Sequence, residues 1–325
     1  MEYTQMGPIR RVSRLVLGGG GIGQIWGETG RDEASATIAL ALDRGINLID
    51  TAPMYRNCEA IIGEHFGGKF PEGIMITSKC RLGTPPPEEV EARILASLEN
   101  SLATMRVPRV DVFFLHTNIC EPDYVYAVRP DRQYVFATNW PIYAERFIPL
   151  MEKLKADGRI GHWGITGTGV PATIIKALSH DPKPDVVQAV TNVLDSAGGM
   201  KNYAEDECPR DIVAAAVANG VGVMGIRAVQ AGALTDAIDR ELPFEHPEAR
   251  DFRRAEPYRA LCHSWAEDPA MIAHRYALAM PGVEAVILGV KNRVELAQCL
   301  EAETLGPLEA ERVADIDALG LSRRA

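Results

Sequence analysis

Short apolar runs alternate with longer amphipathic segments along most of the chain. The runs have the length of buried parallel strands, and the amphipathic segments have the spacing of helices that pack one face on a sheet. The runs span residues 15–20, 46–50, 74–78, 110–116, 162–166, 186–190, 222–226 and 285–289. Helical segments include residues 31–44, 87–105, 171–178 and 293–302, with Gly45, Gly158 and Gly220 where helix C-caps belong. This pattern predicts eight consecutive strand–helix units.

Eight such units favour an α/β fold of the closed (β/α)8 type, a TIM barrel, over an open doubly wound sheet. The chain is expected to form one barrel domain over residues 1–325. Residues 1–14 are expected to form an N-terminal β-hairpin cap across the bottom of the barrel, and residues 307–320 an extra C-terminal helix. The two longest connections, residues 117–143 and 227–268, would lie at the active-site face, where long loops are typical of binding loops.

Composition and charge exclude several classes of protein. Hydrophobic residues make up 46% of the chain and charged residues 24%, and no apolar run reaches the length of about 18 residues that a membrane span requires. The first 14 residues lack the apolar segment of a signal peptide, so a cytoplasmic location is expected. A net charge of −10 with dispersed basic residues disfavours a nucleic-acid partner. We expect a small-molecule partner and no membrane association.

Cysteine and histidine spacing gives no sign of a metal or disulfide framework. The six cysteines contain no C-x-x-C pair, which is typical of free thiols in a reducing compartment. The seven histidines form neither an H-x-H nor an H-E-x-x-H motif. No metal site is therefore expected.

Four polar residues of complementary chemistry stand at or just after the predicted strand ends. Asp50 closes the second strand, Tyr55 follows it, Lys79 follows the third strand and His116 closes the fourth. Barrel enzymes place catalytic groups at these ends, and neighbouring strands lie only about 5 Å apart. Taken singly, each residue has an ordinary role, as a helix cap, a packing residue, a solvated cation or a core histidine. Together they predict a catalytic quartet.

The quartet has a specific chemical use. An ammonium beside a phenol stabilises the phenolate and lowers a pKa that is ordinarily about 10, and a carboxylate keeps a buried ammonium charged. Lys79 can therefore assist Tyr55 as general acid and base, while Asp50 holds Lys79 in its charged form. His116 can donate a hydrogen bond to a carbonyl oxygen. These roles predict the interconversion of a carbonyl (aldehyde or ketone) and an alcohol by hydride transfer.

The segment Asp50-Thr-Ala-Pro-Met-Tyr55, followed by Glu59 and Gly63-Glu64, resembles the aldo-keto reductase superfamily in its bacterial-type form. Similar residues recur at Ser13-Arg-Leu-Val-Leu-Gly18, Ser78-Lys79, Leu115-His116, Gly158-Arg-Ile-Gly161 and Pro281-Gly282. The resemblance covers nearly the whole chain. It implies a (β/α)8 barrel that binds NADP(H) in an extended form without a Rossmann domain, and an NADP-dependent reductase activity.

The resemblance also implies cofactor contacts, several of which depart from the family pattern. The nicotinamide end would be held by Asp50, Thr166 and Gln188, with Ile226 packed on the ring and Arg227 reaching the pyrophosphate. Gly19 and Gly20 would offer backbone contacts. The 2′-phosphate and adenine end would be held by Gly289, Lys291, Arg293, Gln298 and Cys299.

Two alternatives to this function stay open. Glu295 stands where the family commonly has a cation or an amide, which leaves NAD as the cofactor of an NAD-dependent aldose or sugar dehydrogenase. The alternative from another class is a nicotinamide-binding regulatory barrel without turnover, which would bind cofactor but oxidise no NADPH with any carbonyl. Trp26, Trp140 and Tyr143 lie in loops of the predicted active-site face, as an apolar substrate wall or as packing anchors.

Overall fold

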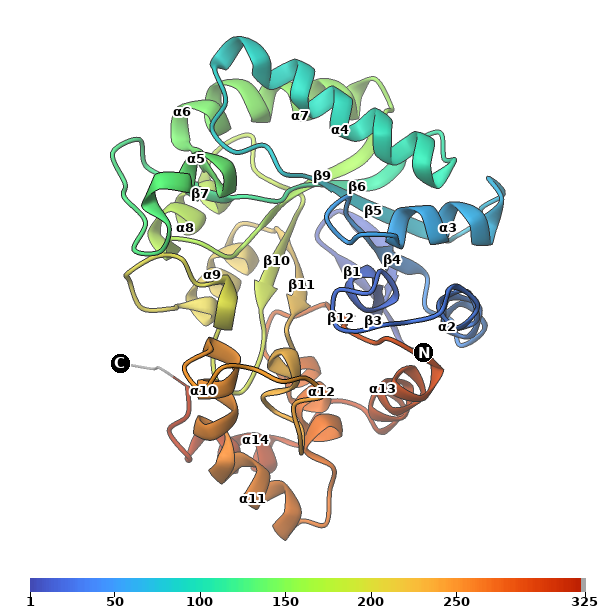
Figure 1. Cartoon of the computed structure of the whole chain (residues 1–325), viewed down its shortest axis with the longest axis vertical. Helices are drawn as coiled ribbons and strands as arrows, with labels where there is room; N and C mark the ends of the chain where they lie inside the picture. Colours follow the sequence, from blue (N-terminus) through green and yellow to red (C-terminus); the bar gives the residue numbers. More distant parts are fainter. Residues whose placement is uncertain (323–325) are drawn as a thin grey trace.

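Eight parallel strands form a closed barrel at the centre of the computed structural model, which describes residues 1–322 (Figure 1). Around the barrel the strands are β3 (Leu15–Gly18), β4 (Leu48–Asp50), β5 (Met75–Cys80), β6 (Val110–Leu115), β9 (Ile160–Thr166), β10 (Val186–Val190), β11 (Gly222–Ile226) and β12 (Ala285–Leu288). Their order around the barrel is their order in the chain, and β12 pairs with β3 to close it. The predicted (β/α)8 fold is confirmed, and each strand overlaps the run predicted for it.

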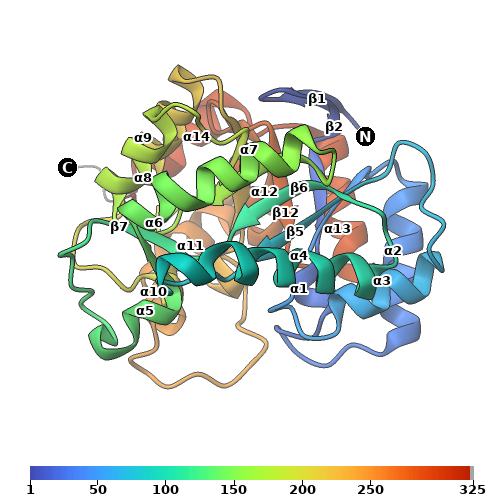
Figure 2. The ribbon, with the colours of Figure 1, turned by 90° about the horizontal axis from the view of Figure 1, so that it is seen from above.

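One long helix follows each barrel strand in the sequence, and these helices form the outer layer (Figure 2). They are α2 (Arg31–Asp43), α3 (Cys58–Phe66), α4 (Val90–Met105), α7 (Ile148–Ala156), α8 (Pro171–Ser179), α9 (Pro209–Ala218), α12 (Pro269–Ala279) and α13 (Arg293–Leu305). The 3-10 turn η1 (Pro87–Glu89) precedes α4. Gly45, Gly158 and Gly220 follow α2, α7 and α9 with φ of 89°, 70° and 69°, as expected of residues that end a helix.

The N-terminal hairpin closes the amino end of the barrel. Its strands β1 (Tyr3–Met6) and β2 (Ile9–Ser13) pair antiparallel, and Met6, Ile9 and Val12 are buried against residues of the barrel interior. In Figure 2 the hairpin lies at one end of the barrel, and the loop that follows β11 lies at the other. The extra C-terminal helix is α14 (Ala310–Asp317). Both predicted additions to the barrel are therefore present.

The alternation of side chains along each strand determines what the barrel presents at its open end. One cluster of buried residues fills the interior and includes Leu48, Phe114 and Val186, whereas Leu115 and its outward-facing counterparts pack under the helices. Because side chains two residues apart share a face of a strand, Asp50, His116 and Gln188 also face inward. The interior is thus apolar at its base and polar at the carboxyl ends of the strands.

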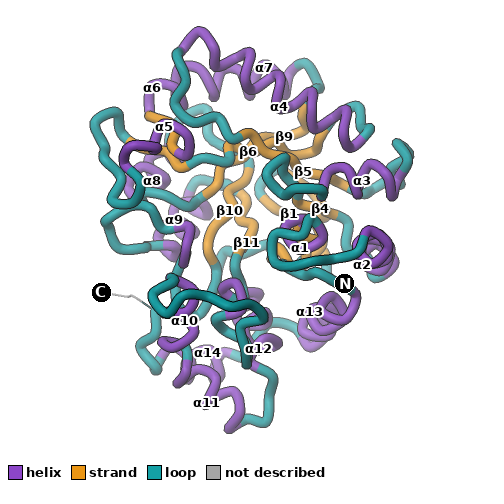
Figure 3. The backbone as a smooth tube through the Cα atoms, in the orientation of Figure 1, coloured by secondary structure: helices purple, strands orange, loops and turns teal. Residues whose placement is uncertain are grey.

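The two long connections are more structured than predicted (Figure 3). The first contains β7 (Asn118–Cys120), η2 (Pro130–Arg132), α5 (Gln133–Phe136), β8 (Ala137–Asn139), α6 (Trp140–Ile142) and the π-helical turn η3 (Tyr143–Phe147). The second contains η5 (Gln230–Gly232), α10 (Pro247–Arg254) and α11 (Glu256–Ser264), and η4 (Gly198–Met200) lies between β10 and α9. Strands β7 and β8 pair with each other outside the barrel, above a small apolar cluster that includes Tyr126 and Tyr203.

Within residues 1–322, no helix combines the length and the apolar character that crossing a membrane would require. The longest barrel-layer helix, α4, has 16 residues and a glutamate in its first turn.

Gly164 is expected to be essential to the packing of the barrel interior. A Cβ atom at this position would lie 2.4 Å from Cε1 of Phe114 and 2.6 Å from the Val186 carbonyl oxygen. We predict that Gly164→Ala lowers the free energy of unfolding by about 1–3 kcal/mol, because the crowded interior must shift. Urea unfolding followed by circular dichroism measures this loss.

The matched control is Gly30→Ala. Gly30 is the N-cap residue that precedes α2, with φ of −61°, and a Cβ there meets nothing within 4 Å. Its unfolding free energy should stay within about 1 kcal/mol of the parent. Equal losses in the two variants would contradict the steric argument.

Candidate active site

Lys79 lies at the centre of the polar residues at the barrel mouth. Its side chain is fully buried, and Nζ donates to Asp50 Oδ2 at 2.7 Å, to the Thr51 carbonyl oxygen at 2.9 Å and to the Tyr55 hydroxyl at 3.1 Å. An ammonium has three N–H bonds, and these contacts use all of them. The geometry is that of a charged lysine held in one orientation.

Asp50 is held by side chains from two other strands, β5 and β10. Its Oδ1 accepts hydrogen bonds from Thr77 Oγ1 at 2.8 Å and from Gln188 Nε2 at 2.6 Å, while Oδ2 faces Lys79. A buried carboxylate needs such partners because desolvation penalises its charge. Asp50 can therefore position Lys79 without moving itself.

Tyr55 and His116 complete the group that the sequence predicted. Tyr55 lies in the turn between β4 and α3, where its backbone N–H donates to the Ala52 carbonyl oxygen at 2.9 Å. Its ring meets the His116 ring edge to face, with centroids 5.7 Å apart and an interplanar angle of 89°. Both side chains are only partly buried. The structure thus brings together all four predicted catalytic residues, with Tyr55 and His116 on the accessible side.

Burial and charge set the protonation of this group. Burial lowers the pKa of His116 to about 3, and the positive charges of Lys79 and Arg81 act in the same direction. Burial also disfavours the charged form of Lys79, but the charge of Asp50 and the Tyr55 hydroxyl outweigh it and raise the pKa of Lys79. At neutral pH His116 is therefore uncharged and Lys79 is charged.

The predicted effect on Tyr55 is only half right. Lys79 does lower the pKa of Tyr55, but burial raises it by more, with Asp50 adding to the rise, so the pKa lies above its ordinary value. A neighbouring positive charge alone would lower the pKa of a phenol, but the desolvation of this buried phenol outweighs the effect of the charge. At neutral pH Tyr55 is therefore a protonated phenol, which can donate its proton.

The tautomer of His116 follows from its surroundings. Its backbone N–H donates to the Cys80 carbonyl oxygen at 2.8 Å, and its buried Nδ1 has no hydrogen-bond partner among the described residues. Buried N–H groups without an acceptor are rare in proteins, and a proton on Nδ1 would be such a group. This favours the proton on Nε2, which makes Nε2 a hydrogen-bond donor.

The predicted nicotinamide residues lie at the inward positions of the following strands. Gln188 donates to Asp50, and Thr166 Oγ1 donates to the Leu115 carbonyl oxygen at 3.0 Å. Ile226 is partly exposed, and a Cβ at Gly289 would meet nothing within 4 Å. Gly289 and Ile226 are thus not covered completely by other parts of the chain.

The glycine run after β3 is packed closely against neighbouring protein atoms. Gly19 and Gly20 begin the short helix α1 (Gly19–Ile22). A Cβ at Gly19 would lie 2.5 Å from Cys58 Sγ, and one at Gly20 would lie 2.9 Å from Trp26 Nε1. A larger residue at Gly19 would clash with Cys58, and Trp26 packs over Gly20 beside the end of β3.

The residues predicted for the adenosine end do not all lie in one place, and the two cations among them form ion pairs with carboxylates. A surface hollow of about 670 Å³ is lined by Glu33, Asn292, Arg293, Val294, Ala297, Gln298 and Glu301. Arg293 pairs with Glu33 at 2.9 Å, and Lys291 pairs with Glu295 at 3.2 Å and with Asp239. Every predicted phosphate-binding cation thus already faces a carboxylate.

Two of the predicted cofactor contacts are corrected by their burial. Cys299 lies on the inner face of α13, where its Sγ is 3.3 Å from His274 Nε2, so it does not share the hollow with Gln298. The Arg227 guanidinium is buried and bonds Glu248 at 2.8 Å and Gln230 at 2.8 Å. Its charge is neutralised inside the protein, which conflicts with a pyrophosphate contact.

Two of the predicted substrate residues are also corrected. Tyr143 is fully buried and stacks on Phe147 with ring centroids 5.9 Å apart, inside the core beneath the helices. Trp140 packs against α8, with Lys176 Nζ 3.8 Å from its ring centroid and His180 beside it. Both are packing anchors, and neither forms part of a substrate wall.

The sequence reasoning missed Thr77, whose hydroxyl holds Asp50, and the Thr51 carbonyl, which holds Lys79. Thr77 could have been found from its position two residues before Lys79, on the same face of β5. The Thr51 contact has no signal in the sequence because it comes from the backbone.

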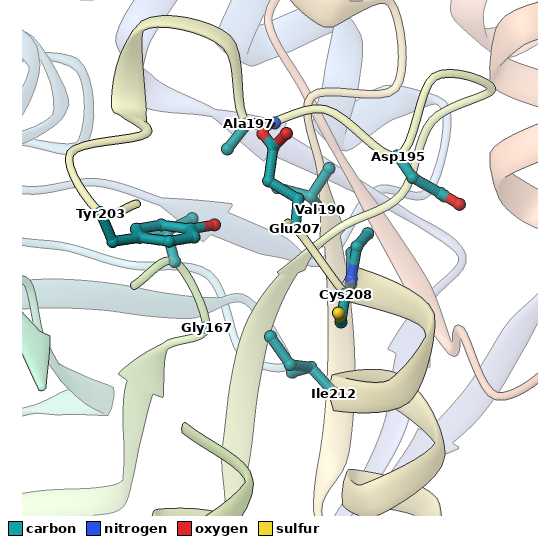
Figure 4. A pocket seen from close by; sticks show the side chains of 10 residues that line it. Gly167, Val190, Asp195, Ala197, Tyr203, Glu207, Cys208 and Ile212 are labelled. Carbon is teal, nitrogen blue, oxygen red and sulfur yellow. Dashed lines mark hydrogen bonds between the residues drawn. The ribbon is translucent and has the colours of Figure 1, made fainter. Parts of the chain in front are cut away.

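A separate cavity near α9 is too small for a substrate (Figure 4). Its volume is about 10 Å³, and Tyr203, Glu207 and Cys208 are among the residues that line it. Such a volume holds one water molecule. Within residues 1–322 there is also no cluster of three or more His, Cys, Asp or Glu side chains arranged to hold a metal ion, and the six cysteines are free thiols.

Comparison with known proteins agrees with the geometry. The model of the Aldo/keto reductase family matches residues 14–320. Among curated proteins, L-galactose dehydrogenase of Arabidopsis thaliana is 25% identical over 317 residues, covering 95% of this chain and 91% of that protein. The NADH-specific methylglyoxal reductase of Escherichia coli strain K12 is 28% identical over 253 residues, covering 71% and 68%.

A solved structure supports the fold. The holo form of aldo-keto reductase AKR11C1 from Bacillus halodurans superposes with a TM-score of 0.70 and 20% identity, covering 98% of this chain and 96% of that one. Taken with the family match over nearly the whole chain and the quartet at the barrel mouth, this shows that the chain belongs to the aldo/keto reductase family of oxidoreductases.

Proposed function

We propose that this protein interconverts a carbonyl compound and an alcohol, with Tyr55 as general acid and base and a nicotinamide cofactor as the hydride carrier. The observation that carries the proposal is the set of hydrogen bonds around Lys79. They place a charged ammonium 3.1 Å from a phenol and 2.7 Å from a buried carboxylate.

Each residue of the quartet has a distinct task in this reaction. When bound, nicotinamide supplies the hydride that reaches the carbonyl carbon. His116 Nε2 donates a hydrogen bond to the carbonyl oxygen and orients it. Tyr55 gives its proton to that oxygen as negative charge develops, and Lys79 stabilises the phenolate that remains. Asp50 keeps Lys79 charged, and the reverse oxidation uses the same groups with the proton moving to Tyr55.

The family resemblance implies NADP(H) as the cofactor. Lys291 and Arg293 would hold its 2′-phosphate, since Lys and Arg are the usual partners of phosphate oxygens. For this, both side chains would exchange their present carboxylate partners for the phosphate. Gln298 and Asn292 in the same hollow offer amides for the adenine.

A specific observation favours a second candidate, an NAD-dependent aldose or sugar dehydrogenase. Two cations at the adenosine end face three carboxylates, Glu33, Asp239 and Glu295. A surplus of negative charge disfavours a phosphate and tolerates the hydroxyl that NAD carries there. Two relatives agree in name, one a sugar dehydrogenase and the other an NADH-specific reductase.

Replacing Tyr55 with phenylalanine tests the proposal directly. We expect Tyr55→Phe to lower kcat by about 10²–10⁴-fold, because the proton donor is lost, with cofactor affinity unchanged within about threefold. NADPH or NADH oxidation with a panel of aldehydes measures turnover, and fluorescence titration measures binding.

Tyr3→Phe is the matched control, because the Tyr3 hydroxyl bonds Gly45 at the opposite end of the barrel. It should keep full activity. Unaltered turnover in Tyr55→Phe would contradict the role of Tyr55. Cofactor binding with no turnover of any carbonyl by the parent protein would instead favour the regulatory barrel.

The pH dependence of reduction follows from His116. Its pKa of about 3 means that the ring stays neutral between pH 5 and 8, whereas an ordinary histidine titrates near 6.5. We expect kcat/KM for reduction to show no inflection near pH 6.5 in this range. An inflection there that His116→Gln abolishes would show that the ring titrates normally.

Cofactor preference is tested at the two ion pairs. In the NADP(H) case, Lys291→Ala weakens NADPH binding more than NADH binding, and Glu33→Gln tightens NADPH about 2–5-fold by freeing Arg293 from an exposed ion pair. Titration of intrinsic fluorescence with each cofactor measures both effects. Equal changes for the two cofactors would contradict the 2′-phosphate role, and tighter NADH binding by the parent would select the second candidate.

A further inference from the structure

Arg81 directly follows the end of β5 and lies two residues beyond Lys79. Thr77 and Lys79 face the barrel interior, where both bond Asp50. Cys80 and Leu82 are buried in the cluster beneath the helices, so they face outward. Since side chains alternate along an extended segment, Arg81 faces the barrel mouth, one layer above Lys79.

The strand register places Arg81 beside His116. Cys80 pairs with Leu115 across β5 and β6, and the His116 N–H donates to the Cys80 carbonyl oxygen at 2.8 Å. Arg81 and His116 therefore follow the same rung of the ladder on strands about 4.8 Å apart. The influence of the Arg81 charge on the His116 imidazole is consistent with this closeness.

The backbone after Arg81 is firmly held, while its side chain is free. The Thr84 N–H donates to the Tyr134 carbonyl oxygen at 2.8 Å, and Thr138 Oγ1 donates to the Gly83 carbonyl oxygen at 2.8 Å. The Arg81 side chain is exposed and makes no hydrogen bond or ion pair with any residue from 1 to 322. The guanidinium is thus presented from a rigid base.

Some cations of the carboxyl-end loops are paired with carboxylates, and others, such as Arg81, Arg129 and Arg132, form no ion pair within residues 1–322. Arg227 pairs with Glu248, Arg240 with Asp239, and Lys291 with Asp239 and Glu295. Of these three unpaired arginines, Arg81 is the one that the strand register places beside His116. A guanidinium offers paired N–H groups that match the oxygens of a carboxylate or a phosphate.

We infer that Arg81 binds an anionic group, a carboxylate or a phosphate, carried by the carbonyl substrate itself. This inference rests on the proposed function. Because Arg81 lies one strand away from His116, the anionic group and the reacting carbonyl are separated by only a few bonds. The substrate class is therefore short carbonyl acids or short phosphorylated aldehydes, together with the corresponding alcohols.

Pairs of substrates that differ in charge test this assignment. The carboxylate pair is 4-oxobutanoate against butanal, and the phosphate pair is glyceraldehyde 3-phosphate against glyceraldehyde. For at least one pair, kcat/KM of the parent should favour the anion, and Arg81→Gln should lower that preference about 10- to 100-fold, the range of a charge-assisted hydrogen bond. Arg81→Lys should restore part of it. The pair that responds identifies the anionic group.

Arg44→Gln is the matched control, since Arg44 is an exposed arginine that follows α2 at the hairpin end of the barrel. Arg44→Gln changes the net charge by the same amount as Arg81→Gln. It should leave the kcat/KM ratio of the anionic to the neutral aldehyde unchanged in both substrate pairs. If the parent turns over the neutral aldehydes but Arg81→Gln leaves both ratios unchanged, the Arg81 assignment is wrong and the proposed function stands. If no aldehyde of either pair is turned over with NADPH or NADH, the Arg81 assignment is wrong, whereas the proposed function fails only if no other aldehyde or ketone is turned over either.

Discussion

The buried ion pair between Lys79 and Asp50 is the interaction on which the active-site structure depends. The two side chains are 0% and 3% exposed. Removing one partner from such a pair leaves an uncompensated charge in a region of low dielectric constant, which is strongly destabilising, whereas the intact pair adds little stability. The ion pair matters because it positions the Lys79 ammonium. Through its hydrogen bonds with Thr51, Thr77 and Gln188, the pair fixes the point at which Tyr55 meets the charge of Lys79.

The barrel makes this arrangement feasible by separating apolar and polar layers along one axis. The hairpin seals the amino end with Met6, Ile9 and Val12, and the interior cluster fills the middle. The same alternation that buries Leu48, Phe114 and Val186 directs the residues two positions later toward the mouth. Desolvation from the apolar layer then acts on the polar one, which is why His116 stays neutral and why Tyr55 keeps its proton despite Lys79.

Charges around the mouth divide into two groups. Near the adenosine end, Lys291 and Arg293 are paired with carboxylates and compete with any incoming phosphate. Beside His116, Arg81 has no such competitor among residues 1–322. Under the proposed function, the positive charge of Arg81 beside His116 would favour the approach of an anionic substrate.

The sequence alone determined the barrel and the quartet, because both depend on local order. Strand periodicity, helix-ending glycines and the spacing of Asp50, Tyr55, Lys79 and His116 are all visible within short segments of the chain. Only the tertiary structure decided the protonation of these groups and the contacts of the other predicted site residues. Tyr143 packs on Phe147, and Cys299 contacts His274. Arg227 forms an ion pair with Glu248, and Arg293 forms one with Glu33, which lies 260 residues away in the sequence. Burial and long-range charge pairing arise only when distant segments are brought together, and no local pattern encodes them.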